Sequence, residues 1–299
     1  KLFVEAEIRK MGKKNLWIGP SLGDWLAMGK GIAWQAMHNN PVSNAFIVHD
    51  LKVISETAER LGKKADADRY RRQMEATTEA YIRKFVSKKG IVAKDYQSAY
   101  IMALKFVLPE GELREQVKKN FAANIRKNGL QTGFFATEYL LPLIVEAGET
   151  ELAYDILLQE GCPGWMYQVK CGATTTWERW DALKPDGTVN EEKMAGSGDN
   201  MVSFNHYAFG SVGEFYYQYI LGIKPQKPGF AELHFEPYPD RRLGGVSGSY
   251  LSRAGKIESS WKYEEDGCHI SLNTPVKSEV VLPDGKKETV EAGTYQWLC

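Results

Sequence analysis

The chain lacks an excess of charge of either sign, and it has no long apolar run. Its 299 residues carry 38 Lys and Arg against 38 Asp and Glu, so the formal net charge is zero. No apolar stretch reaches the roughly 18 residues that a membrane-spanning helix needs. A balanced composition offers no basic field for nucleic acid, and no basic amphipathic helix indicates a membrane surface. We therefore expect neither nucleic acid nor a membrane as a partner.

Cysteine is also scarce. Cys162, Cys171, Cys268 and Cys299 show neither the C-x-x-C spacing of a metal site nor the density of a disulfide framework. We expect mostly free thiols, with a disulfide left open, and no required metal or other cofactor. The chain opens without an initiator Met or a signal-peptide pattern. A fragment is the expectation, and the location of its parent protein, cytoplasmic or exported, stays undecided.

What the sequence has is the composition of a folded protein, with 43% hydrophobic and 25% charged residues. In the first two thirds, apolar residues recur at spacings of three and four, the period of amphipathic helices. One helix is predicted from Ser43, as its cap, to about Leu61, with Gly62 as its stop. Short connections join the helices as antiparallel hairpins, so we expect the chemistry on the longer loops between pairs. The other predicted helices cover residues 65–86, 96–107, 110–127, 135–147, 149–159 and 205–221.

After Gly222 the pattern changes to prolines followed by short alternating runs, which are typical of strands. The sequence therefore predicts two domains, residues 1–222 and residues 223–299. The second is expected to be a small antiparallel β domain that packs or caps, because its charges are scattered. Its predicted strands cover residues 231–235, 248–253, 255–264, 267–273, 278–281 and 287–290.

One polar and aromatic stretch stands out, Gly-Ala-Thr-Thr-Thr-Trp-Glu-Arg-Trp-Asp at residues 172–181. It places Glu178 between Trp177 and Trp180. Indole faces stack on the apolar faces of sugar rings, and desolvation or a neighbouring cation such as Arg179 tunes a carboxylate for acid or base chemistry. These residues are typical of a sugar-processing site. A surface loop with a buried aromatic anchor fits the composition equally well.

Two further segments carry similar residues. In Gly-Asp-Trp at residues 23–25, Asp24 and Trp25 suit either a helix cap followed by a core indole or a ligand contact. In the segment Ser-Phe-Asn-His-Tyr from residue 203, His206 is the one histidine at the start of a predicted apolar helix. A hydrogen-bonded structural histidine and a catalytic one are both consistent with that position.

Together, and in this order, these segments resemble the α-L-rhamnosidases of glycoside hydrolase family 78. The similarity covers nearly the whole chain. It implies part of an (α/α)6 toroid built from helical hairpins, followed by a small antiparallel β-sandwich domain. The implied reaction is hydrolysis of terminal α-L-rhamnosyl residues, in an oligosaccharide or glycoside, with inversion. The matching motifs are Gly-Asp-Trp-Leu-Ala at 23–27, Thr-Gly-Phe at 132–134, Gly-Cys-Pro-Gly-Trp-Met-Tyr at 161–167, the segment at 172–181, and Phe-Asn-His-Tyr-Ala-Phe-Gly-Ser-Val-Gly-Glu at 204–214.

The resemblance also implies roles for single residues. Glu178 takes the role of the general base that activates water, while an acid on the opposite face protonates the departing oxygen. His206 matches a histidine that contacts sugar hydroxyls. The remaining candidates are Trp25 and Trp177 as walls against the sugar ring, Asp24 as a cap or a hydroxyl contact, Trp180 and Trp165 as contacts or supports, and Arg179 as a residue that orients a carboxylate.

The family's acid lies upstream, in an Asp- and Arg-rich segment ending in a Gly-Trp-Thr-Gly-Asp type motif, and this sequence contains no such segment. About seven substantial helices are predicted, whereas six hairpins need twelve. We therefore expect a fragment of a longer enzyme that is inactive alone. A second interpretation is a chain that pairs with a separate chain carrying the missing N-terminal half, or with a second copy of itself. The alternatives are a carbohydrate-binding or structural remnant, another inverting glycosidase on the same fold, and an acid recruited from Glu138 or Glu214.

Overall fold

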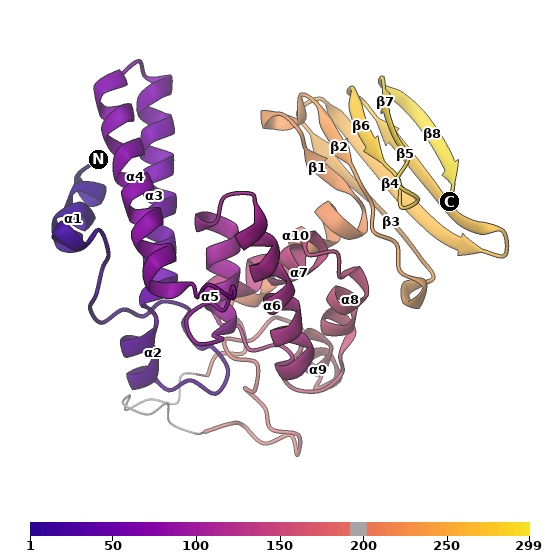
Figure 1. Cartoon of the computed structure of the whole chain (residues 1–299). Helices are drawn as coiled ribbons and strands as arrows, with labels where there is room; N and C mark the ends of the chain where they lie inside the picture. The colour runs from indigo at the N-terminus through magenta and orange to yellow at the C-terminus, as the bar shows by residue number, and fades with distance from the viewer. Residues whose placement is uncertain (192–201) are drawn as a thin grey trace. The chain divides into compact units, whose positions relative to one another are not determined.

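The computed structural model describes residues 1–191 and 202–299, which fall into two compact units (Figure 1). The first unit, Lys1–Phe209, is helical, and the second, Gly210–Cys299, is built mainly from strands. None of the described helices combines the length and the apolar character needed to cross a membrane. The four cysteines form no disulfide.

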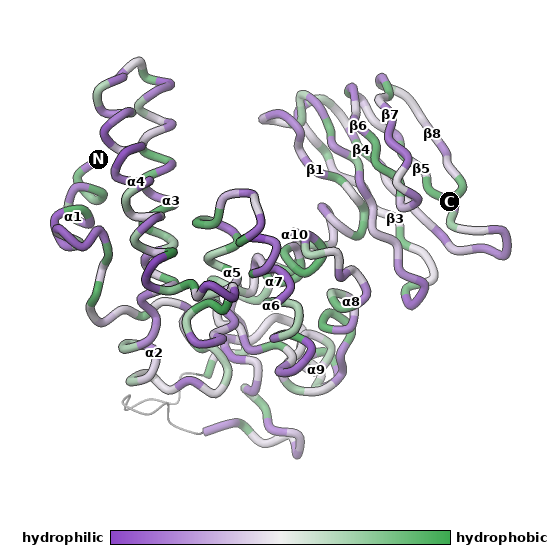
Figure 2. Tube along the Cα trace, viewed as in Figure 1, coloured by the Kyte–Doolittle hydropathy of each residue, from purple (hydrophilic) through white to green (hydrophobic). Residues whose placement is uncertain are grey.

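Three antiparallel hairpins form the centre of the helical unit within the described residues. In Figure 2, hydrophilic and hydrophobic residues alternate along the longest pair, as the period of an amphipathic helix requires. All three helix pairs were predicted from the sequence, and the structure confirms them. They are α3 (Asn40–Arg60) with α4 (Lys64–Phe85), α5 (Gln97–Met102) and its π-helical last turn (Ala103–Val107) with α6 (Glu112–Asn128), and α7 (Phe134–Glu146) with α8 (Thr150–Leu158).

The first predicted helix begins earlier than expected. α3 starts at Asn40 with Pro41 in its first turn, where the missing N–H of proline costs no hydrogen bond. Ser43 therefore lies inside the helix, and its hydroxyl donates to Oγ of Ser21 at 2.7 Å instead of capping. The predicted stop is correct, because Gly62 has the positive φ of 71° that a helix end favours.

Three short helices were not predicted: α1 (Leu2–Met11), α2 (Ile32–His38) and α9 (Trp165–Lys170). α1 packs on the first hairpin, where its Val4 and Met11 join a buried cluster with Leu51 of α3. The guanidinium of Arg69 on α4 donates to both carboxylate oxygens of Glu5, at 2.7 and 2.8 Å. One side of α1 is therefore held by apolar contact and by an ion pair.

The helix predicted over residues 205–221 is wrong in its extent. The segment forms three short turns, η3 (Ala208–Ser211), α10 (Val212–Phe215) and η4 (Tyr216–Ile220), and begins three residues later. Gly210 and Gly213 fall within these turns, and glycine is the weakest helix former after proline. The residues around His206 are consequently part of a loop.

The second unit contains two four-stranded sheets. β2 and β6 run parallel, with Leu233 opposite Ser278, so the domain is not purely antiparallel as predicted. β1 and β8 were not predicted. Trp261 and Ile270 are among its buried core residues. One sheet has the order β1 (Ile223–Pro225), β2 (Leu233–Phe235), β6 (Ser278–Val281), β7 (Lys287–Val290), and the other β3 (Gly245–Ser252), β4 (Gly255–Glu264), β5 (Gly267–Thr274), β8 (Gly293–Leu298).

Candidate active site

Glu178 and His206 lie on two loop segments that hydrogen bonds hold side by side. The backbone N–H of Glu178 donates to the carbonyl of Ser203 at 2.8 Å, and that of His206 donates to the carbonyl of Thr176 at 2.9 Å. The hydroxyl of Thr176 donates in return to the carbonyl of His206 at 2.6 Å. Two motifs that are distant in the sequence are therefore brought together.

The carboxylate of Glu178 is half-buried, and none of the described residues donates a hydrogen bond to it. Arg179, which was expected to tune or orient a neighbouring carboxylate, pairs with Asp181. Its Nε and Nη2 donate to the two carboxylate oxygens of Asp181 at 2.6 and 2.9 Å. The side chain of Glu178 can therefore bind a water molecule without first breaking an ion pair among the described residues.

The ring of His206 is held in one orientation and one tautomer. It stacks on Phe134, with ring centroids 4.6 Å apart, and on Tyr207 at 5.1 Å. The backbone N–H of Ala208 donates to its Nδ1 at 3.3 Å. Since Nδ1 accepts, the proton of the neutral imidazole is on Nε2, which makes Nε2 the donor for an oxygen of a ligand.

The two indoles predicted on either side of Glu178 are not open to solvent. Trp177 and Trp180 are 2% and 0% exposed, a position that suits a support better than a wall against a sugar. In contrast, Phe204 is 40% exposed and Tyr207 87% exposed. The sequence interpretation missed both residues, although their position beside His206 in one motif was a signal for them.

Two buried indoles support the loop that carries Glu178. Nε1 of Trp180 donates to the carbonyl of Thr132 at 2.9 Å, and its ring stacks on Phe209 with centroids 3.8 Å apart. Trp165 packs edge-on against Trp180 at 5.0 Å, and its Nε1 donates to the carbonyl of Phe209. For these two residues the structure favours support over contact with a ligand.

Asp24 is fully buried and caps the start of α7. Its carboxylate accepts the backbone N–H groups of Gly133, Phe135 and Ala136 at 2.8 to 3.0 Å, and the hydroxyl of Ser98 at 2.5 Å. Burial raises the pKa of Asp24, while these four hydrogen bonds oppose the rise. Because every contact is internal, the structure favours the cap and not a contact with a sugar hydroxyl.

Gly133 lets the loop of Asp24 lie directly against the start of α7. A Cβ atom on this residue would stand 2.2 Å from the carbonyl oxygen of Trp25. That oxygen accepts the N–H of Phe134 at 2.9 Å, and the indole of Trp25 is half-buried. The turn at residues 132–134 is therefore the point where the Asp24, Trp180 and His206 segments meet.

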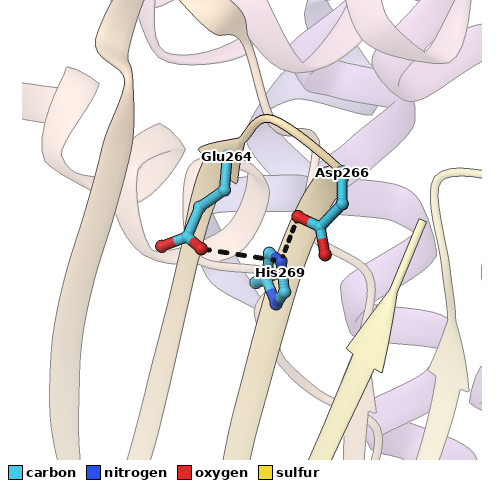
Figure 3. A group of neighbouring side chains, drawn as sticks. All are labelled: Glu264, Asp266 and His269. Atoms are coloured by element: carbon cyan, nitrogen blue, oxygen red, sulfur yellow. Dashed lines mark hydrogen bonds and ion pairs between the residues drawn. The ribbon is translucent and has the colours of Figure 1, made fainter.

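The β unit holds polar side chains that do converge, in contrast to the scattered charges expected. At the turn between β4 and β5, Nε2 of His269 lies 2.7 Å from Asp266 and 3.8 Å from Glu264 (Figure 3). The hydrogen bond to Asp266 raises the pKa of His269. Their ligand atoms lie within 4.8 Å of one another, but all three residues are exposed, and the ion pairing alone accounts for the arrangement.

The comparison with known proteins gives the family. The model of the bacterial alpha-L-rhamnosidase 6 hairpin glycosidase domain matches residues 3–220, and that of the bacterial alpha-L-rhamnosidase C-terminal domain matches residues 222–296. The chain belongs to the bacterial α-L-rhamnosidase family. An α-L-rhamnosidase of Alteromonas sp. (strain LOR) is 34% identical over 282 residues, which are 91% of this chain and 30% of the relative.

Solved α-L-rhamnosidase structures have the same fold. That of Streptomyces avermitilis, complexed with L-rhamnose, has a TM-score of 0.87 and 28% identity, with 98% of this chain and 30% of that chain covered. The native enzyme of Aspergillus terreus has a TM-score of 0.83 and 28% identity, with 92% and 32% covered. The chain thus spans less than a third of the length of these rhamnosidases, which are glycoside hydrolases.

Proposed function

We propose that the chain is the base-bearing part of an inverting α-L-rhamnosidase catalytic domain, with Glu178 as the general base. The observation that carries this proposal is the pairing of residues 176–178 with residues 203–206. It pairs the segment of Glu178, whose carboxylate no described residue binds, with the segment of His206, whose Nε2 carries the proton. A water-activating base next to a donor for sugar hydroxyls is what hydrolysis of a glycoside requires.

In this proposal, Glu178 accepts a proton from water as the water oxygen bonds to the anomeric carbon. The glycosidic C–O bond breaks on the opposite face, where an acid about 6.5–9.5 Å away protonates the departing oxygen. Nε2 of His206 donates to a hydroxyl of the rhamnosyl ring. Tyr207, Phe204 and the half-buried Trp25 offer apolar surface to that ring.

The general acid in this proposal comes from outside residues 1–299. Among the acids considered within the chain, Glu214 accepts a hydrogen bond from Nε2 of Gln218 at 2.6 Å in its own helical segment, and Glu138 lies within α7. Both fit structural roles. Without an acid the barrier to leaving-group departure stays high, so we expect the chain alone to be inactive.

Hydrolysis of an aryl α-L-rhamnoside tests the assignment. We expect turnover only when the remaining hairpins of the domain are supplied, and Glu178→Gln should then lower kcat by about 10²- to 10⁴-fold with little change in KM. Glu160→Gln is the matched control, because Glu160 is exposed and pairs with Lys170. Proton NMR should show the inverted anomer as the first product. Turnover by the chain alone, or by Glu178→Gln, would contradict the proposal.

The exposed rings of Phe204 and Tyr207 also suit binding of a carbohydrate without turnover. A thermal shift distinguishes this second function. If rhamnose raises the melting temperature while no rhamnoside is hydrolysed by the completed domain, binding is the better description, because a ligand specific to the folded state stabilises it. Hydrolysis of a different aryl glycoside would instead indicate another substrate on the same fold.

A further inference from the structure

A groove of about 470 Å³ opens in the helical unit, with walls from α1, α3 and the start of α7. Large apolar side chains line it without being covered. Phe3 is 68% exposed and Phe135 48% exposed, and Phe46 packs edge-on against Phe135 with ring centroids 5.5 Å apart. A contiguous apolar surface of this kind marks a site of interaction.

α1 carries one glutamate on each of two sides, and the two carboxylates differ in their hydrogen bonds. The side that faces α4 carries Glu5, whose carboxylate accepts hydrogen bonds from Arg69 and from the hydroxyl of Tyr70. The side that lines the groove carries Phe3 and Glu7, which lie together because residues four apart share a helix face. Oε2 of Glu7 is shielded from solvent, and no described residue donates a hydrogen bond to it. The groove therefore contains an acceptor that lacks its donor.

A second carboxylate, Asp50 of α3, lines the same groove. Burial and then the charge of Asp50 raise the pKa of Glu7 to about 7, while Lys10 opposes the rise. Burial likewise raises the pKa of Asp50, and His49 opposes it. The groove is lined by these two carboxylates and by one cation, Lys10. A second cation that enters between the carboxylates would balance the remaining charge, because a paired charge costs less to bury than a lone one.

The size of the domain indicates what supplies that cation. The matching family model describes a six-hairpin domain, whereas the described residues of this chain form three hairpins. The chain also covers only 30% of the Alteromonas and Streptomyces avermitilis relatives. Helical hairpins pack through their apolar faces, so an incomplete set leaves such a face open.

We propose that this groove is the docking surface for the remaining hairpins of the catalytic domain, which insert an arginine or lysine side chain, flanked by apolar residues, between Glu7 and Asp50. The identity of the partner rests on the proposed function, whereas the location of the docking surface rests on the groove alone. The aromatic rings give the surface its apolar area, and the two carboxylates select a partner with a basic side chain.

Binding to the 299-residue chain tests the docking surface. The probe is a separate polypeptide that carries the helical hairpins of Streptomyces avermitilis α-L-rhamnosidase outside its match to this chain. Calorimetry should show saturable binding with one probe per chain. Glu7→Lys and Asp50→Lys should each weaken binding by about tenfold or more at low salt. Glu56→Lys is the matched control, because it makes the same charge change on α3 at an exposed position outside the groove.

Phe135→Ser provides a variant that keeps its fold, since the ring is already half exposed and its removal costs the isolated chain little. We expect its melting temperature to stay unchanged while its binding weakens by about tenfold. Carbon-detected NMR titration gives an independent readout. The pKa of Glu7 should fall from about 7 when the probe is bound, because a cation favours the ionised carboxyl.

Several outcomes would contradict the proposed docking surface. They are no binding by the unaltered chain, an equal loss in Glu56→Lys, or an unchanged pKa of Glu7 in the complex. A chain that forms dimers alone, and that Glu7→Lys makes monomeric, would identify a second copy as the occupant instead. Binding without rhamnoside hydrolysis would support the docking surface and contradict the proposed function. Binding retained in Glu178→Gln with hydrolysis lost would support both.

Discussion

Three carboxylates of the helical unit share one chemistry and differ in their surroundings. Asp24 has four donors around it and is fully buried. Glu178 has no donor among the described residues and is half-buried, and Glu7 lies in a groove beside another carboxylate. Donor number and burial therefore give three carboxylates of the same chemistry three different environments, and of the three only Asp24 has its oxygens filled by internal donors within the described part of the chain.

Removing the Asp24 carboxylate should destabilise the helical unit. Asp24→Ala leaves three backbone N–H groups at the start of α7 without an acceptor, so we expect a loss of about 2–4 kcal/mol. Urea denaturation followed by circular dichroism at the helix band measures it. Asp68→Ala is the control, because Asp68 is exposed and pairs only on the surface with Arg71, and it should cost less than about 0.5 kcal/mol. Equal losses in the two variants would refute the capping role.

At the scale of elements, ion pairs as well as backbone hydrogen bonds connect β1 and β2. Lys224 and His234 lie 3.1 and 3.2 Å from the carboxylate of Glu236. The hydrogen bond from His234, followed by the charge of Lys224, lowers the pKa of Glu236 to about 2 despite burial. The same hydrogen bond raises the pKa of His234. Both shifts favour the charged forms, so His234 and Glu236 form an ion pair in mildly acidic solution.

Glu236→Gln should change how stability depends on pH. The contribution of Glu236 is present above its unfolded value of 4.5 and is lost as the pH falls towards its folded value of about 2. We expect the variant to be less stable than the unaltered chain by about 1–2 kcal/mol near pH 5.5, and the difference to shrink by about pH 3.5. Thermal unfolding at the two pH values measures this. A difference that grows on acidification would exclude the ion pair as its source.

The sequence predicted those elements whose apolar residues follow one period. The three helical hairpins are such elements, because each helix buries a single stripe of apolar residues. α1 was missed because Phe3 faces the groove while Val4 faces α3, so its apolar residues form no single stripe. The pairing of the Glu178 and His206 segments agrees with the sugar site that the family resemblance implies for both residues. The burial of Trp177 could not be predicted, because an indole that packs inward and one that faces a ligand look alike in a sequence.

At the scale of the whole molecule, the helical unit has an open face that holds negative charge. Asp50 raises the pKa of Glu7 there, and partial burial removes part of the water that would solvate both ionised carboxylates, while Lys10 offsets part of the cost at Glu7. The chain by itself therefore folds with an unfavourable charge in its groove. Such a site lowers the stability of the isolated chain and stabilises a complex that supplies a cation.

Glu7→Gln should consequently stabilise the isolated chain in alkaline solution. The folded pKa of about 7 exceeds the ordinary 4.5, so stability is greatest below the lower value and falls as the pH rises through the higher one. We expect the variant to exceed the unaltered chain by about 1–2 kcal/mol near pH 8 and to match it near pH 4. Urea denaturation checks this, with Glu56→Gln as a control that should show no such trend. If the variant and the unaltered chain were equally stable near pH 8, the ionised carboxylate of Glu7 would not destabilise the fold.

Phe134 and Phe135 are neighbours in the first turn of α7 and point to different surroundings. Phe134 stacks on the imidazole of His206, whereas Phe135 lines the groove. Successive helical residues are about 100° apart on one backbone, so this single turn places one ring in the groove and the other against the imidazole. The two surroundings are thus separated by one residue of the chain, and a substitution in this turn alters both.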